Sequence, residues 1–213
     1  MKVSKGKRLL ILGILLVIID QIIKVLVKTN MDLGETIDVI GDWFKLHFVL
    51  NKGMAFGMAF GGLWGKVLLS VFRIVLFGAL CWWISSLAKK EQTPVGVLVG
   101  LTMITAGAFG NIIDCLFYGM IFNNPPAPIV ADFVPFGTGY DTLVYGRVVD
   151  MFYFPIIDTN WPAWMPFVGG EHFIFFSPIF NFADAAISCG IIALLLFYGK
   201  DFNDAYHAAI KKS

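Results

Sequence analysis

Apolar residues run through this chain in four long stretches, which polar residues separate. An α-helix needs roughly 20 mostly apolar residues to cross a hydrocarbon core of about 30 Å. Four stretches reach about that length, over residues 9–27, 67–88, 95–118 and 175–199. The pattern therefore predicts an all-α integral membrane protein with four transmembrane helices. No internal repeat or second hydrophobic pattern divides the chain, so we expect one domain over residues 1–213.

The first apolar stretch invites a second interpretation, because the basic residues Lys2, Lys5 and Lys7 precede it as they would in a secretory signal peptide. Asp20 and Lys24 interrupt the stretch, however, and no small-x-small cleavage site follows it. We therefore expect a retained transmembrane helix.

Lysine and arginine near the ends of the helices predict the orientation. They occur in three regions that fall on one side of a four-helix protein: the N-terminal tail, the connection with Lys89 and Lys90, and the C-terminal tail. Both termini should then be cytoplasmic, with long loops over about 28–66 and 119–173 on the outer face. A period of two over residues 44–50 predicts a half-buried strand in the first loop. The tryptophans Trp161 and Trp164 of the second loop suit a membrane–water interface.

Composition agrees with membrane insertion: 58% of the residues are hydrophobic, 15% are charged, and mean hydropathy is +0.77. About a quarter of the residues of an ordinary soluble domain are charged. The net charge of +1 and the lack of a basic cluster argue against nucleic-acid binding. Cys81, Cys115 and Cys189 lie in apolar stretches without metal-ligand spacing, so we expect small buried side chains, no metal site and no cofactor.

Ionisable residues inside membrane helices are candidates for functional sites. Asp20 and Lys24 have i, i+4 spacing, which fits either a self-contained ion pair or a contribution to a site. Arg73 can snorkel outward or point into a site. Asn111 and Asp114 share a helix face, either as a buried hydrogen-bonded pair or as part of a site. Gly107 and Gly110 allow close helix packing beside them.

Two further carboxylates lie at the outer end of the predicted bundle. Asp150 closes GRVVD, and Asp184 follows Asn181 by three residues in FNFAD, about two turns into the fourth predicted helix. The third helix ends outward and the fourth begins there, so Asp114, Asp150 and Asp184 should converge near the outer membrane surface.

Two carboxylates at close range share a proton near neutral pH, because both cannot ionise cheaply. One can then activate water while the other donates a hydrogen bond to a carbonyl group, as in aspartic proteases. The three histidines are scattered with no H-E-x-x-H, and no G-x-S-x-G is present, so motifs for a metalloprotease or a serine protease are missing.

Five short motifs occur in an order that resembles the lipoprotein signal peptidases, the bacterial type II signal peptidases. They are DQIIK at 20–24, NKGMAF at 51–56, GNIID at 110–114, GRVVD at 146–150 and FNFAD at 180–184. The resemblance implies an aspartic endopeptidase of the bacterial inner membrane. It would cut lipid-modified prolipoproteins before the diacylglyceryl-cysteine, near the periplasmic face and in contact with membrane lipids.

The resemblance also assigns roles to residues. It makes Asp150 and Asp184 the catalytic pair, and it gives Asp20 a role in supporting the fold. It implies a small periplasmic β-containing cradle in the first outer loop, where the substrate lies. The polar and glycine positions that it places in or around the site are Asn51, Gly53, Asn111, Asp114, Asn181, Lys24 and, by the argument below, Arg73.

The chain departs from the family pattern in two places. Cys115 stands where the family usually has an arginine that contacts ligand, and we expect Arg73 to approach the same depth and replace it. A long periplasmic insertion over 115–145 separates GNIID from GRVVD, and we expect an aromatic cover over the substrate groove.

The alternative function is a small transporter or proton-conducting protein, in which the polar residues of the helices form a path across the bundle. Two features argue against it: the acidic residues gather near one face, and the chain lacks the inverted repeat of many transporters. A purely structural bundle is the remaining interpretation.

Overall fold

The protein is described by a computed structural model over residues 4–51 and 62–210. Three helices are long and apolar enough to cross a membrane, spanning Lys5–Asn30, Gly65–Ala88 and Val95–Ile121. In order, the elements are α1 (Lys5–Asn30), β1 (Thr36–Ile40), β2 (Phe44–Asn51), α2 (Gly62–Ala88), α3 (Val95–Ile113), the π-helical turn η2 (Asp114–Tyr118), α4 (Gly119–Ile121), β3 (Val148–Tyr153), β4 (Ile157–Asn160), β5 (His172–Phe175), β6 (Ile179–Phe180), α5 (Phe182–Phe197) and α6 (Gly199–Ile210).

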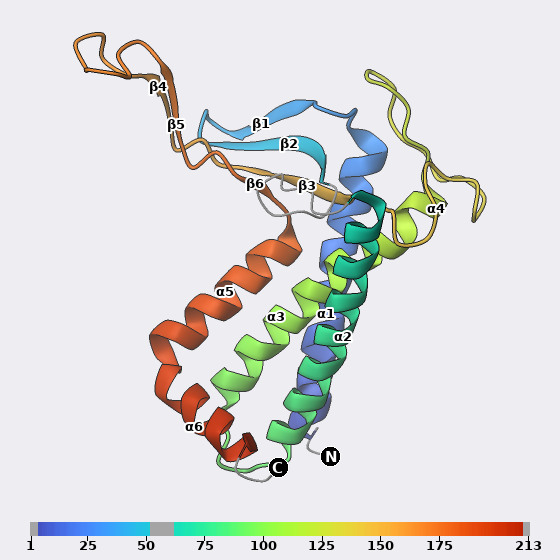
Figure 1. Cartoon of the computed structure of the whole chain (residues 1–213), viewed down its shortest axis with the longest axis vertical. Coiled ribbons are helices and arrows are strands. Elements are labelled where there is room, and N and C mark those ends of the chain that lie inside the picture. The colour runs from blue at the N-terminus through green and yellow to red at the C-terminus, as the bar shows by residue number, and fades with distance from the viewer. Residues whose placement is uncertain (1–3, 52–61, 211–213) are drawn as a thin grey trace.

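The long helices form a bundle around α3, and a sheet lies across one end of it (Figure 1). α3 packs against α1, α2 and α5. A Cβ atom at Gly107 would overlap the carbonyl oxygen of Ala183 on α5, and one at Gly110 would press on the carboxylate of Asp20. The expected close packing at both glycines is confirmed, because only a hydrogen atom fits between the helices there.

The fourth helix was predicted over 175–199, and its predicted start is wrong. α5 begins at Phe182 because the side chain of Asn181 accepts a hydrogen bond from the backbone of Asp184 and caps the helix. The residues before it form β6 and the end of β5 instead. Asp184 therefore lies in the first turn of α5, rather than two turns into it.

The predicted class, all-α with one small β-containing cradle, understates the β-structure. A four-stranded sheet has the order β1-β2-β3-β6, and β4 and β5 form a separate two-stranded sheet. The strand expected over 44–50 is confirmed as β2, and it pairs antiparallel with β3, which carries Asp150. β3 also pairs antiparallel with β6, which ends at Phe180, one residue before Asn181. Local periodicity does not reveal this pairing between segments far apart in the chain.

The β4–β5 hairpin projects from the sheet, away from the helices (Figure 1). Trp164 and Phe167, in the connection between these strands, are 80% and 100% exposed. Among the cysteines, Cys115 is buried and Cys81 is half-buried, but Cys189 on α5 is exposed, which corrects the expectation of three buried thiols.

The two ends of the insertion over 115–145 lie next to each other at the end of the bundle. The backbone N–H of Gly146 donates to the carbonyl oxygen of Cys115 at 2.9 Å, and further backbone bonds tie Tyr140 to Phe122 and Asp141 to Gly119. A Cβ atom at Gly146 would overlap the carbonyl oxygen of Asp114, so a glycine permits this closure. Because the two ends meet, the length of the insertion does not set the position of β3.

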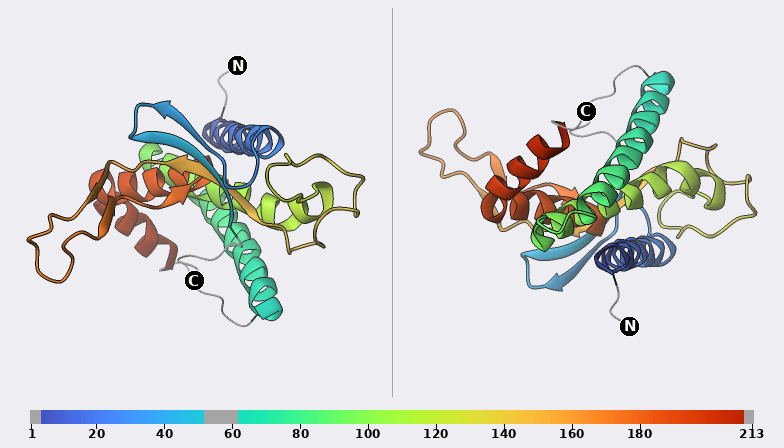
Figure 2. Two further views of the ribbon diagram at one scale, coloured as in Figure 1. Left: turned by 90° about the horizontal axis from the view of Figure 1, so that it is seen from above. Right: turned by 90° about the horizontal axis from the view of Figure 1, so that it is seen from below.

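A buried lysine holds the insertion against the bundle. The ammonium group of Lys28, near the end of α1, lies 5.3 Å from the ring centres of Phe122 and Tyr140 and 5.8 Å from that of Phe48. Such cation–π contacts strengthen when the cation is desolvated. The insertion lies on the opposite side of the bundle from α5 in both views (Figures 1 and 2). The insertion therefore does not cover α5, and the expected aromatic cover over the substrate groove stays a prediction.

Candidate active site

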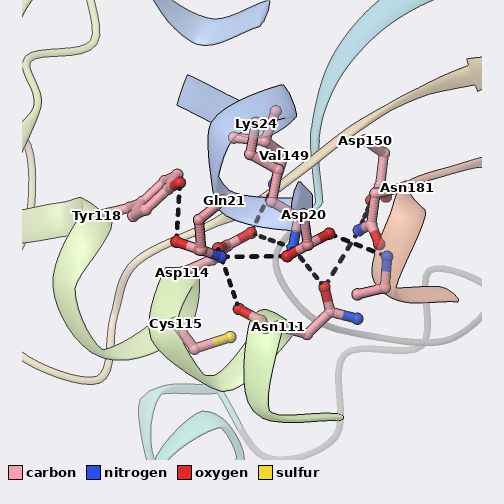
Figure 3. A network of polar contacts seen from close by, with 12 residues as sticks. Asp20, Gln21, Lys24, Asn111, Asp114, Cys115, Tyr118, Val149, Asp150 and Asn181 are labelled. Carbon is pink, nitrogen blue, oxygen red and sulfur yellow. Dashed lines mark hydrogen bonds and ion pairs between the residues drawn. The ribbon is translucent and has the colours of Figure 1, made fainter. Parts of the chain in front are cut away.

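Lys24 lies at the centre of the polar network between the helices (Figure 3). Its side chain is fully buried, and its ammonium nitrogen is 2.9 Å from Asp20 Oδ2, 2.8 Å from Asp114 Oδ2 and 2.8 Å from Asn111 Oδ1. All three N–H donors of the ammonium group thus have acceptors. The expected Asp20–Lys24 ion pair is confirmed, and it extends to α3.

Gln21 joins the same network, although its neutral side chain gave no signal in the sequence beyond its place in DQIIK. Its amide nitrogen donates to Asp114 Oδ1 at 3.0 Å and to Asp20 Oδ2 at 3.1 Å, and its oxygen accepts from the Tyr118 hydroxyl at 3.2 Å. Asp114 Oδ2 also accepts from the backbone N–H of Val149 at 3.3 Å. Asp114 therefore fixes β3 one residue before Asp150.

Asn111 connects this network to α5. Its oxygen accepts from Lys24 and its amide nitrogen donates to Asp184 Oδ1 at 2.8 Å. Asn111 and Asp114 share a helix face as expected, but they are joined through Lys24 rather than directly to each other. Asp20 reaches α5 as well, because its Oδ1 accepts from the backbone N–H of Ala183 at 2.9 Å.

Asn181 lies between the two candidate catalytic carboxylates. Its amide nitrogen donates to Asp150 Oδ1 at 2.7 Å and to Asn111 Oδ1 at 3.1 Å. Its oxygen accepts from the backbone N–H of Asp184, whose carboxylate accepts in return from the backbone N–H of Asn181 at 3.3 Å. This capping box orients Asp184 and Asn181 together.

Asp150 is 2% exposed, whereas Asp184 is half-buried. Asn51, on the neighbouring strand β2, donates its amide to Asp150 Oδ2 at 3.1 Å. Burial, and next the charge of Asp184, raise the pKa of Asp150 to about 7, against the opposing effect of the hydrogen bonds from Asn51 and Asn181. Near neutral pH this carboxyl group can hold a proton beside a second carboxyl group.

Arg73 of α2 reaches the C-terminal end of α3. Its Nη1 donates to the Cys115 sulfur over 3.5 Å. The expected replacement of an arginine at position 115 by Arg73 stays a prediction. Hydrogen bonds and ion pairs connect eight of the ten sequence-predicted site residues: Asp20, Lys24, Asn51, Asn111, Asp114, Asp150, Asn181 and Asp184. Arg73 contacts Cys115, the residue that follows Asp114. Gly53 lies outside the described residues.

The fold is similar to a solved structure described as a bacterial membrane enzyme. The match has a TM-score of 0.60 and 22% sequence identity, and it covers 92% of this chain and 94% of that chain. Together with the three long apolar helices, this similarity defines an integral membrane protein.

Sequence comparison identifies the family. The model described as Signal peptidase (SPase) II matches residues 12–199. A lipoprotein signal peptidase of Porphyromonas gingivalis is 48% identical over 92% of this chain and 85% of its own length. Another, from Amoebophilus asiaticus, is 38% identical over 87% of this chain and 75% of its own length. The chain therefore belongs to the signal peptidase II family, bacterial membrane proteases that remove signal peptides from prolipoproteins.

We expect Lys24→Met to destabilise the protein by about 3–5 kcal/mol, because it leaves Asp20 and Asp114 as uncompensated buried charges. Thermal or denaturant unfolding in detergent measures the loss. The triple variant Asp20→Asn, Lys24→Met, Asp114→Asn should recover much of it, because no buried charge remains.

The matched control is Lys45→Met, which breaks the solvent-exposed ion pair with Asp38 and should change stability little. Equal losses in Lys24→Met and in the control would contradict a structural role for the buried network.

Proposed function

We propose that the protein removes signal peptides from prolipoproteins as an aspartic endopeptidase, with Asp150 and Asp184 as the catalytic pair. The observation that carries the proposal is the connection of these carboxylates through Asn181, with a raised pKa of about 7 at buried Asp150. No cofactor is needed, because one ionised and one protonated carboxyl group supply both the base and the acid.

In this mechanism Asp150 carries the shared proton at rest, because burial and the neighbouring charge favour its neutral form. Half-buried Asp184 takes a proton from water, and the resulting hydroxide adds to the scissile carbonyl carbon. Asp150 gives its proton to the carbonyl oxygen as the tetrahedral intermediate forms. The intermediate then collapses, Asp150 recovers that proton, and the departing amine receives the proton held by Asp184.

The amides of Asn111 and Asn181 hold the two carboxyl groups in position for these steps. Each donates to one carboxylate, and both are anchored to Lys24 through the oxygen of Asn111. Preorganised donors of this kind need no rearrangement when charge develops. Asn51 supports Asp150 from the adjacent strand.

The substrate we infer is a prolipoprotein cut before its diacylglyceryl-cysteine, with β1, β2, β3 and β6 as the cradle at the membrane surface. Exposed apolar side chains on β1 and the following turn, including Ile37, Val39, Ile40 and Trp43, support contact with lipid or with the lipidated segment. The bilayer would then hold the lipidated cysteine and the apolar signal helix at the depth of the pair.

We propose that α5 is the fourth transmembrane helix of an inner-membrane protein whose two termini face the cytoplasm. Its 16 residues, most of them apolar, extend about 24 Å, which is short of a full hydrocarbon core, so a thinned bilayer or flanking residues must complete the span. The basic residues of the tails support this orientation. A reporter that is active only after export, fused to the C-terminus, should be inactive. Activity of this reporter would contradict the proposed orientation.

The transporter alternative is not favoured. The buried ion pairs join Asp20, Lys24 and Asp114 in one cluster, and buried Lys28 is enclosed by aromatic rings. A conducting path would instead need polar groups at successive depths of the membrane.

We expect Asp150→Asn and Asp184→Asn each to lower cleavage by about 100-fold or more, because each removes a proton donor or acceptor of the reaction. The measurement is the release of a new N-terminal cysteine from a diacylglyceryl-modified precursor peptide in detergent or lipid. Asp158→Asn, at an exposed carboxylate of β4, is the matched control and should retain activity. Normal processing by either site variant would make the assignment wrong.

The pH profile of kcat/KM should fall on its basic side near pH 7, where Asp150 loses the shared proton. The hydrogen bond from Asn51 favours the ionised carboxylate and so lowers the pKa of Asp150. Asn51→Ala should therefore raise that pKa and move the basic limb to higher pH. Asn160→Ala, at an exposed asparagine of β4, should leave the limb unchanged, and a shift to lower pH in Asn51→Ala would contradict the assignment.

Arg73 is proposed to bind the substrate in place of the arginine absent at Cys115. Loss of one charged hydrogen bond costs about 1.5–3 kcal/mol, so Arg73→Ala should lower kcat/KM by about 10- to 100-fold with an unchanged unfolding temperature. Arg73→Lys should retain part of the activity, and Cys115→Arg in the Arg73→Ala background should restore some. Near-normal cleavage by Arg73→Ala would exclude the role.

A further inference from the structure

A cavity of about 480 Å³ lies between α1, α2 and α3, in the half of the bundle that contains the N-terminus. Its walls include Gly6 and Gly13 of α1, Cys81 and Ala88 of α2, and Thr102 and Ala106 of α3. No residue of α5 lines it. The cavity therefore opens on a different face of α3 from the one that meets Asp184.

The cavity offers hydrocarbon rather than hydrogen bonds. The hydroxyl groups in its wall are already used, since Thr102 donates to the carbonyl of Leu98, Thr105 to that of Leu101, and Ser85 to that of Cys81. The other lining side chains are apolar or glycine, apart from the Cys81 thiol. An occupant must therefore bring an apolar chain to this depth of the membrane.

Basic residues flank the cavity in sequence, at its end nearest the N-terminus. Gly6 and Ala88 line the cavity, and their neighbours in sequence are Lys5, Lys7, Arg8, Lys89 and Lys90. The Lys5 ammonium donates to the carbonyl of Thr93 at 2.9 Å, which brings the start of α1 beside the α2–α3 connection. Within residues 4–51 and 62–210, none of these five cations forms an ion pair with a carboxylate. Glu91 is the acid in the connection itself.

We propose that this groove binds an anionic phospholipid, with one acyl chain in the cavity and the phosphate among the five cations. Basic pockets between membrane helices on the cytoplasmic side bind such headgroups, with about 1 kcal/mol contributed by each lysine or arginine. The signal helix of the substrate fits this groove poorly, because its own n-region is basic and would meet the same cations. The lipid is thus a partner separate from the substrate.

Native mass spectrometry of the purified protein in neutral detergent tests the proposal with two lipids of equal chain length, phosphatidylglycerol and phosphatidylcholine. We expect phosphatidylglycerol to bind at least about tenfold more tightly. Lys7→Gln with Lys89→Gln should remove most of that preference, whereas Lys200→Gln, at an exposed lysine of α6, should leave it unchanged.

Gly6→Leu tests the cavity itself, because a Cβ atom at Gly6 meets nothing within 4 Å and the added side chain enters the groove. It should lower the binding of both lipids by about tenfold. Gly78→Leu is the matched control, since Gly78 on α2 is exposed, has equally open surroundings and does not line the cavity.

Three results would overturn the proposal. Equal affinity of the unmodified protein for the two lipids would remove the role of the cations and requires no variant. Unchanged lipid binding in Gly6→Leu would remove the role of the cavity. Displacement of phosphatidylglycerol by a synthetic signal-peptide helix, or by dimerisation of the protein, would assign the groove to the substrate or to a second copy.

Discussion

The buried ammonium group of Lys24 is the interaction on which the site depends. It binds Asp20 on its own helix and both Asp114 and Asn111 at the outer end of α3. A charge in a low-dielectric interior is tolerated only when its partners are close and well oriented, so these residues have little freedom to move. Asp114 then holds the backbone of β3, and Asn111 holds Asp184, so that one cation fixes the surroundings of both carboxylates.

The two carboxylates of the candidate catalytic pair come from elements that are far apart in sequence. Asp150 arrives on β3 through pairing with β2, while Asp184 arrives in the first turn of a helix that Asn181 caps. Asn181 serves as both the helix cap and the donor to Asp150. The end of the insertion is tied to Cys115, so a long segment is added without a change in where β3 begins.

α3 presents two faces with different chemistry. Towards α5 and the outer side it carries the asparagine and aspartate of the site, and towards α1 and α2 it forms one wall of an apolar groove. Close packing at Gly107 and Gly110 joins α3 to α5 and α1. One helix thus carries both the polar candidate site and one wall of the apolar cavity.

The sequence by itself determined the membrane class, the first three long helices and the strand at 44–50, because periodicity is a local signal. It also marked Asp20, Lys24, Asp114 and Asp184 as candidates, because charges in apolar helices are rare. It did not reveal the four-stranded sheet, the start of α5, the role of Gln21 or the position of the insertion. Those depend on contacts between distant segments: backbone pairing of β2, β3 and β6, a helix cap, and ring contacts around Lys28. Only the tertiary structure decided them, because hydrogen bonds and cation–π contacts of this kind leave no periodic pattern along the chain.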